Sequence, residues 1–178
     1  MSKESGLNVT IERRPPVKLY PFERFFGGFA DVPPVRGLFG AATQKVLRGL
    51  KVEFFSGRFG YMSTSDVDGH LLINLHHLKE AEFRTVYLDI VHELCHVRQF
   101  RRKQPLFYPK LSYVDAPSEI EAYRITVREG RRLGMTDREL FDYLHMFWLS
   151  PSEHRRLARR VGLAVPRPVH RRSRTLPS

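Results

Sequence analysis

The sequence has little that would tie the chain to a membrane or to an oxidising compartment. Its single cysteine, Cys95, excludes an internal disulfide and a structural zinc site built from cysteines. It contains no run of about 18 apolar residues, so a membrane span is not expected. The first residues, MSKESGLNVTIERRPP, lack the apolar stretch of a secretory signal. These absences together predict a cytoplasmic protein.

What the chain does have is enough apolar residues for a folded core and an uneven excess of positive charge. Hydrophobic residues make up 42% of its 178 residues, which is typical of a globular domain. The net charge is +11, and the segment from Pro151 to Ser178 alone carries eight Arg and one Glu. We predict a disordered basic tail over residues 164–178, with nucleic acid or an acidic protein as possible partners.

Residues 1–36 are predicted to form an irregular arm ahead of the main domain. Proline fixes φ and removes a backbone donor, so the five prolines of this segment exclude long helices. Its aromatic residues nevertheless indicate that the arm packs onto the domain; they are Tyr20, Phe22, Phe25, Phe26 and Phe29. The main domain is expected to span residues 37–163.

The pattern of this main domain predicts an α+β fold. Apolar spacing indicates helices at about 37–50, 79–102, 118–133, 137–149 and 151–161. Aromatic and β-branched residues indicate strands at 52–57, 58–65 and 70–75, with a turn at 65–69 joining the last two as a hairpin. The expected sheet is small, mostly antiparallel and about three-stranded.

The stretch YLDIVHELCHVRQF carries the most specific motif, HExxH, at residues 92–96. Residues four apart lie on the same face of a helix, so His92 and His96 can bind one ion. Zinc accepts histidine nitrogen at about 2.0–2.1 Å. Glu93 lies about 100° round the helix from His92, so it can reach a water on the metal without being a ligand.

The same helix is predicted to have a polar front and an apolar back. With His92 at 0°, Asp89 falls near 60° and Gln99 near −20°. The opposite side is apolar and consists of Val86, Tyr87, Ile90, Leu94 and Val97. One face of the helix should therefore pack on the core while the other lines a cleft.

A catalytic zinc site needs a third protein ligand. The spacing of a metzincin would require Gly and His where Gln99 and Arg102 stand. A downstream histidine, as in SprT-like proteins, is disfavoured because no His occurs between His96 and His145. A glutamate on the next helix remains, and that helix carries both Glu119 and Glu121.

With these features, residues 38–133 resemble a minimal gluzincin metallopeptidase, in the neighbourhood of the ImmA/IrrE-like and other small intracellular zincins. In gluzincins the ligand glutamate commonly precedes a small residue early in its helix, which matches Glu121-Ala122. Glu119, on nearly the opposite face, is the alternative, and Ser118-x-x-Glu121 also fits a capping box. The resemblance further implies that the strand at 71–75 lies at the sheet edge and pairs with a peptide substrate. We interpret His76 and His77, which follow it, as surface residues.

The predicted function is zinc-dependent hydrolysis of peptide bonds in an intracellular protein. Zn²⁺ on His92, His96 and Glu121 would lower the pKa of a bound water to about 7, and Glu93 would act as general base. Tyr113 is the first candidate donor to the oxyanion, with Tyr123, His145 and His154 as weaker ones, and Asp89 or Asp115 could orient a metal-binding histidine. The alternative is a non-catalytic binding module on the same scaffold, whose basic tail contacts its partner.

Overall fold

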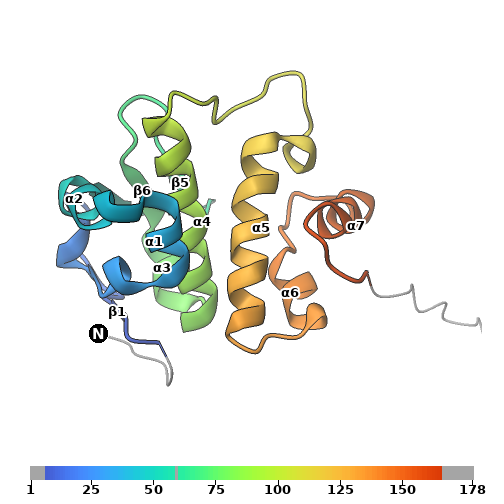
Figure 1. Ribbon diagram of the computed structural model, residues 1–178, viewed down its shortest axis with the longest axis horizontal. Coiled ribbons are helices and arrows are strands. Elements are labelled where there is room, and N and C mark those ends of the chain that lie inside the picture. The colour runs from blue at the N-terminus through green and yellow to red at the C-terminus, as the bar shows by residue number, and fades with distance from the viewer. Residues whose placement is uncertain (1–6, 59, 166–178) are drawn as a thin grey trace, which may run out of the picture.

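The computed structural model describes residues 7–58 and 60–165 of the chain. These residues form an α+β fold, as the sequence predicts (Figure 1). Residues 166–178 lie outside the described part. The disorder of the basic tail and its contact with nucleic acid or an acidic partner therefore stay predictions.

The main sheet has four strands in the order β2-β4-β6-β5. The strands are β2 (Leu19–Pro21), β4 (Lys51–Phe55), β5 (Met62–Thr64) and β6 (Leu71–Asn74). β5 and β6 pair antiparallel across the turn at residues 65–69, which confirms the predicted hairpin. β2 also pairs antiparallel with β4, whereas β4 and β6 run parallel. The sheet is mostly antiparallel, and the arm supplies a fourth strand that the sequence did not indicate.

The parallel pairing places β6 inside the sheet and β5 at its edge. The prediction that residues 71–75 form the edge strand is therefore wrong. Both neighbours of β6 are strands, so its backbone groups are already engaged. β5 has a strand on one side only among the described residues, and it takes the edge position instead.

The described part of the arm, residues 7–36, packs onto the domain, as its aromatic residues predict. It also contains regular structure: a second sheet, in which β1 (Thr10–Ile11) pairs antiparallel with β3 (Phe26–Gly27), and two short 3-10 helices, Phe22–Arg24 and Phe29–Asp31. Its aromatic side chains hold it in place. Phe22, Phe25, Phe26 and Phe29 are buried in the same cluster as Phe54 of the sheet and Tyr87 of the HExxH helix.

The described residues form seven α-helices: α1 (Pro33–Phe39), α2 (Thr43–Gly49), α3 (Leu75–Glu80), α4 (Phe83–Arg101), α5 (Pro117–Arg132), α6 (Asp137–Tyr143) and α7 (Pro151–Arg160). The helix predicted at 37–50 is interrupted at Gly40, whose φ of 56° lies outside the helical region. The helix predicted at 79–102 is also two helices, because Ala81 and Glu82 have extended backbones. None of the described helices is long and apolar enough to cross a lipid bilayer.

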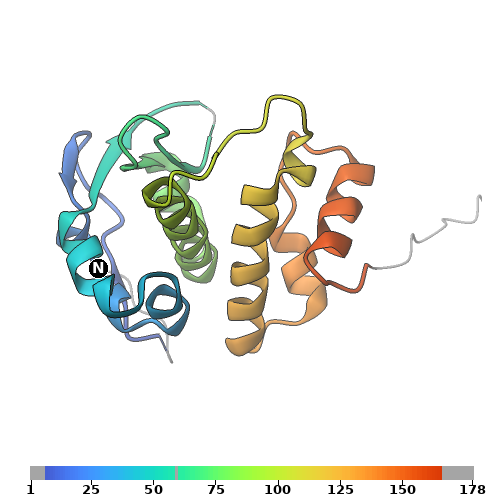
Figure 2. The same ribbon diagram turned by 45° about the horizontal axis from the view of Figure 1, so that its top comes forward.

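α4 is the central helix, with the sheet and the N-terminal elements on one side and α5 on the other (Figures 1 and 2). α4 and α5 run antiparallel and lie side by side. α6 and α7 cover the far side of α5 and enclose a second apolar cluster around Val127, Leu140 and Leu157. Both faces of α5 are thus packed, which fixes its rotation about its own axis.

Capping explains where the last helices begin. Thr136 and Ser150 form the predicted capping boxes of α6 and α7, with Glu139 and Glu153 as their reciprocal partners. The capping box predicted at Ser118 is wrong. α5 begins at Pro117, and the Ser118 hydroxyl donates to the Leu106 carbonyl at 2.9 Å.

Gly28 is expected to be the glycine least tolerant of a side chain. Its φ is 80°, and a Cβ atom there would lie 2.2 Å from the backbone oxygen of Asn8. We expect Gly28→Ala to lower the free energy of unfolding by about 1–3 kcal/mol, because strain and a backbone clash add. The matched control is Gly37→Ala in α1, where no atom lies within 4 Å of the added Cβ. Chemical denaturation followed by circular dichroism should separate the two variants, and equal stabilities would contradict this account.

Candidate metal centre

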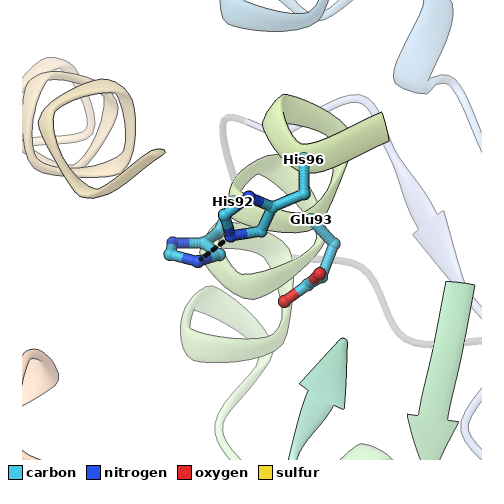
Figure 3. A group of neighbouring side chains, drawn as sticks. All are labelled: His92, Glu93 and His96. Atoms are coloured by element: carbon cyan, nitrogen blue, oxygen red, sulfur yellow. Dashed lines mark hydrogen bonds between the residues drawn. The ribbon is translucent and has the colours of Figure 1, made fainter. Parts of the chain in front are cut away.

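α4 presents both imidazoles of the HExxH motif on one side, facing α5 (Figure 3). The two side chains are only 7% exposed, and their Nε2 atoms lie 2.9 Å apart. Glu93 points to a different side, toward the strands. As the four-residue spacing predicts, two imidazole nitrogens lie close together, and a carboxylate lies beside them.

Glu119 completes the group from α5. Its Oε2 lies 3.2 Å from Nε2 of His92, and its Oε1 lies 3.4 Å from Nε2 of His96. Ligand atoms at about 2.0–2.1 Å from a tetrahedral zinc are roughly 3.3 Å apart. Two nitrogens and a carboxylate group thus form a triangle of the size that zinc requires.

The electrostatics of this triangle favour a cation between the three side chains. Burial alone would raise the pKa of Glu119, but the imidazoles of His92 and His96 lower it well below its usual range. Burial alone would lower the pKa of His96, but the carboxylates of Glu119 and Glu93 raise it to about 9. Oε2 of Glu119 is buried and makes no hydrogen bond of ordinary geometry within the described residues. A divalent ion would bind this oxygen, and its positive charge would replace that of the proton that the raised pKa keeps on His96.

Glu121, which the sequence favours as the third metal ligand, does not lie beside His92 and His96. Its carboxylate lies 2.6 Å from the Arg98 guanidinium and accepts a hydrogen bond from the Gln99 amide at 2.7 Å. It faces away from both imidazoles, so the expectation that Glu121 approaches them is wrong. The alternative, Glu119, occupies that place because Ala122 and Tyr123, three and four residues on, are the buried face of α5.

Gln99 holds the second imidazole in its orientation. Its carbonyl oxygen lies 2.7 Å from Nδ1 of His96, and its amide nitrogen donates to the Ser118 carbonyl at 3.1 Å. A proton held on Nδ1 leaves Nε2 of His96 free for a metal. Glu121 bonds the same amide, so it acts on His96 through Gln99.

Glu93 is buried beside the triangle and is held by the edge strand. The Thr64 hydroxyl of β5 donates to its Oε2 at 2.8 Å. Burial raises the pKa of Glu93 above its usual range. A carboxylate with a raised pKa is suited to exchange protons near neutral pH.

Two tyrosines line the opposite wall. The hydroxyls of Tyr113 and Tyr123 lie 2.9 Å apart, and the Tyr123 ring packs on His92 with centroids 4.2 Å apart. Burial raises the pKa of both hydroxyls well above their ordinary value, so both remain protonated donors. Tyr113 and Tyr123 both line the cleft of the candidate site, and the role of Tyr113 as oxyanion donor stays a prediction.

These groups line one cleft of about 1290 Å³ between the edge strand and the C-terminal helices. Residues 62–64 of β5 form one wall, and Tyr113, Glu119 and Tyr123 belong to the other. His92, His96 and Glu119 all face into this cleft.

Two further predictions about supporting residues need correction. Asp89 bonds neither imidazole of the motif; it pairs with Nε2 of His77 at 2.7 Å and accepts from the Tyr143 hydroxyl at 2.9 Å. His77 is consequently half-buried in the wall of the cleft and not a surface residue. Asp115 pairs with arginines of α7 and is not at the centre.

Of the two histidines considered as weaker oxyanion donors, only one lies at the cleft. His145 lines the cleft, whereas His154 bonds the Phe141 carbonyl at 2.7 Å and packs in the second cluster. Cys95 is fully buried, and burial raises the pKa of its thiol to about 12, so it offers no thiolate to a metal.

No family model, curated protein or solved structure matches this chain.

Proposed function

We propose that this protein is a zinc-dependent metallopeptidase of the gluzincin type, with His92, His96 and Glu119 as its metal ligands. The observation that carries the proposal is the approach of these three side chains: the two Nε2 atoms lie 2.9 Å apart, Oε2 of Glu119 lies 3.2 Å from His92, and Oε1 of Glu119 lies 3.4 Å from His96. Two imidazoles and one carboxylate are the ligand set of catalytic zinc sites in peptidases, where a fourth position stays open for water.

Zinc bound there would supply Lewis acidity, lowering the pKa of a coordinated water to about 7 and polarising a carbonyl. Glu93 accepts the proton of the attacking water and passes it to the leaving amine. The bond from Thr64 fixes the carboxylate of Glu93 in the direction of the cleft. Gln99 keeps the proton of His96 on Nδ1 during both steps.

The oxyanion that forms on the carbonyl needs hydrogen-bond donors. Tyr113 and Tyr123 are the candidates, because their neutral hydroxyls lie in the wall opposite Glu93. The Tyr123 hydroxyl donates to the Met146 sulfur at 3.4 Å, a weak acceptor, so its proton can turn to an oxyanion in the cleft while the Tyr113 hydroxyl donates to Tyr123. A tyrosine that stays protonated can supply this bond throughout the reaction.

The edge strand supports a peptide as the substrate. β5 lines the cleft with residues 62–64, and its outer side carries no other strand among the described residues. An extended peptide can add to such an edge through backbone hydrogen bonds, irrespective of its sequence. Thr64 on this strand contacts Glu93, so a peptide lying along β5 passes the catalytic group.

Removal of the metal should abolish hydrolysis reversibly. Purified zinc-loaded protein is incubated with a mixture of unstructured peptides, and new termini are identified by mass spectrometry. We expect cleavage to stop after dialysis against a chelator and to return with one equivalent of Zn²⁺, because water is activated only on the metal. Cleavage that persists in protein shown to be metal-free, or a zinc-loaded protein that cleaves no peptide, would refute the proposed activity.

A further inference from the structure

The chain has one tryptophan, Trp148, and it lies in the wall of the cleft. It belongs to the loop between α6 and α7, in a stretch predicted from the sequence to be helical. Its side chain is 45% exposed although it borders two well-packed parts of the molecule. Large exposed apolar surface beside a cleft is typical of binding sites.

Trp148 is joined by two tyrosine rings from different parts of the chain. The Tyr61 ring, just ahead of β5, lies 5.6 Å from it, and the Tyr113 ring lies 6.3 Å from it at an angle of 84°. We call these three residues the aromatic wall. Tyr113 packs near Tyr123, which packs on His92, so a single ring separates the wall from this proposed metal ligand.

The neighbouring Phe147 occupies a different place. It is 60% exposed and packs edge-on against Tyr61, with ring centroids 6.2 Å apart. It lines a separate cavity of about 820 Å³ behind Tyr61, together with Asn74 and His76. Two adjacent exposed aromatic residues thus face two cavities, and only Trp148 faces the cleft of the metal centre.

The chemistry of the wall favours an uncharged side chain. Burial raises the pKa of the Tyr61 hydroxyl, and the negative charge of Asp89 adds to this. Both oxygens of Asp89 already have partners, His77 and Tyr143. An ammonium or guanidinium group at the wall would have to share these oxygens with His77 and Tyr143, whereas the exposed ring face of Trp148 is available for apolar contact.

We propose that the aromatic wall is the specificity site of the cleft and binds an aromatic or large aliphatic side chain of the peptide. The proposal rests on the peptidase function for the identity of the ligand. The wall lies a short distance along the cleft from His92, so the bound side chain belongs to a residue near the scissile bond. Selectivity arises because only a large apolar group covers the exposed face of Trp148.

The single tryptophan allows binding to be measured without turnover. Zinc-loaded Glu93→Gln protein is titrated with tryptophan-free peptides that are identical except for one residue, which is Phe, Leu, Lys or Gly. We expect the Phe and Leu peptides to shift the Trp148 emission to shorter wavelength in a saturable manner. Their Kd should be at least about 10-fold lower than that of the Gly peptide, which corresponds to the loss of one well-buried apolar side chain.

Variants test whether Trp148 itself provides the selectivity. With dye-labelled peptides and anisotropy as the readout, Trp148→Ala should remove the preference for Phe over Gly, and Trp148→Phe should largely restore it. Leu111→Ala, which removes an equally exposed apolar side chain outside the cleft, is the matched control and should keep the preference within about twofold. Circular dichroism should confirm that all three variants are folded.

Two results would overturn the aromatic wall as the specificity site. One is a Lys peptide that binds as tightly as the Phe peptide. The other is saturable binding with no change in Trp148 emission, and with the same selectivity in Trp148→Ala. These results are distinct from a failure of the proposed peptidase function. In that case the wild-type protein would cleave no peptide but would still bind the Phe and Leu peptides selectively.

Discussion

A Glu93→Gln protein is expected to retain its zinc and to hydrolyse peptides about 10²–10⁴-fold more slowly than the wild type. Glutamine has nearly the shape of glutamate, and its carbonyl oxygen can still accept the hydrogen bond from Thr64. Its amide cannot take a proton from water. The chemical step is therefore lost while the packing of α4 against β5 is kept.

The control for this variant is its metal content. Inductively coupled plasma mass spectrometry should give the same zinc-to-protein ratio for Glu93→Gln and for the wild type, because Glu93 is not one of the three proposed ligands. Initial rates are then compared at equal zinc occupancy. A fully metallated Glu93→Gln protein with unchanged rates would exclude Glu93 as the general base.

The second large effect is expected from Glu119→Ala, which should weaken zinc binding by more than about 100-fold. Loss of a ligand should exceed the roughly 10–100-fold effect of changing an outer-shell partner. The change removes the only carboxylate within 3.4 Å of both imidazoles in the described part of the chain. Competition with a chromophoric chelator measures the affinity directly.

Glu121→Ala is the matched control, since it removes a carboxylate from the same turn of the same helix. Its effect on zinc affinity should be about 10-fold or less, at the lower end of outer-shell effects. Gln99 keeps its bond to the Ser118 carbonyl when Glu121 is absent, so His96 stays oriented. Loss of zinc from Glu121→Ala but not from Glu119→Ala would reverse this assignment of the third ligand.

The core of the candidate site could be predicted because it is local in sequence. His92, Glu93 and His96 lie within two turns of one helix, and the period of the helix alone decides which side chains converge. The same wheel places Gln99 beside His96, and the structure makes it the partner of that imidazole. No knowledge of tertiary packing was needed for these positions.

The third carboxylate depends on how α5 is rotated against α4, which packing on both of its faces decides. The sequence-based choice of Glu121 relied on the small residue that follows it, and the capping box with Ser118, the other role considered for Glu121, does not form. A better signal was present. Glu119 is three and four residues before the apolar Ala122 and the aromatic Tyr123, whereas Glu121 is three and four residues before Arg124 and Ile125, only one of which is apolar.

The sheet order could not be read from the sequence, because it depends on pairing between distant segments. The hairpin of β5 and β6 is local and follows from its turn residues. The parallel pairing of β4 with β6, and the addition of β2 from the N-terminal segment, are not local. For the same reason the contact between Thr64 and Glu93 could not be foreseen.

The central claim is that His92, His96 and Glu119 hold one zinc ion, and X-ray absorption at the zinc edge tests it most directly. The purified wild-type protein should bind one zinc per chain. Its spectrum should require two imidazole nitrogens at about 2.0–2.1 Å and oxygen ligands at about 2.0–2.2 Å, with no sulfur shell. Glu119→Ala should change the oxygen shell. A spectrum fitted without imidazole, or a wild-type protein that binds no zinc at all, would contradict the account.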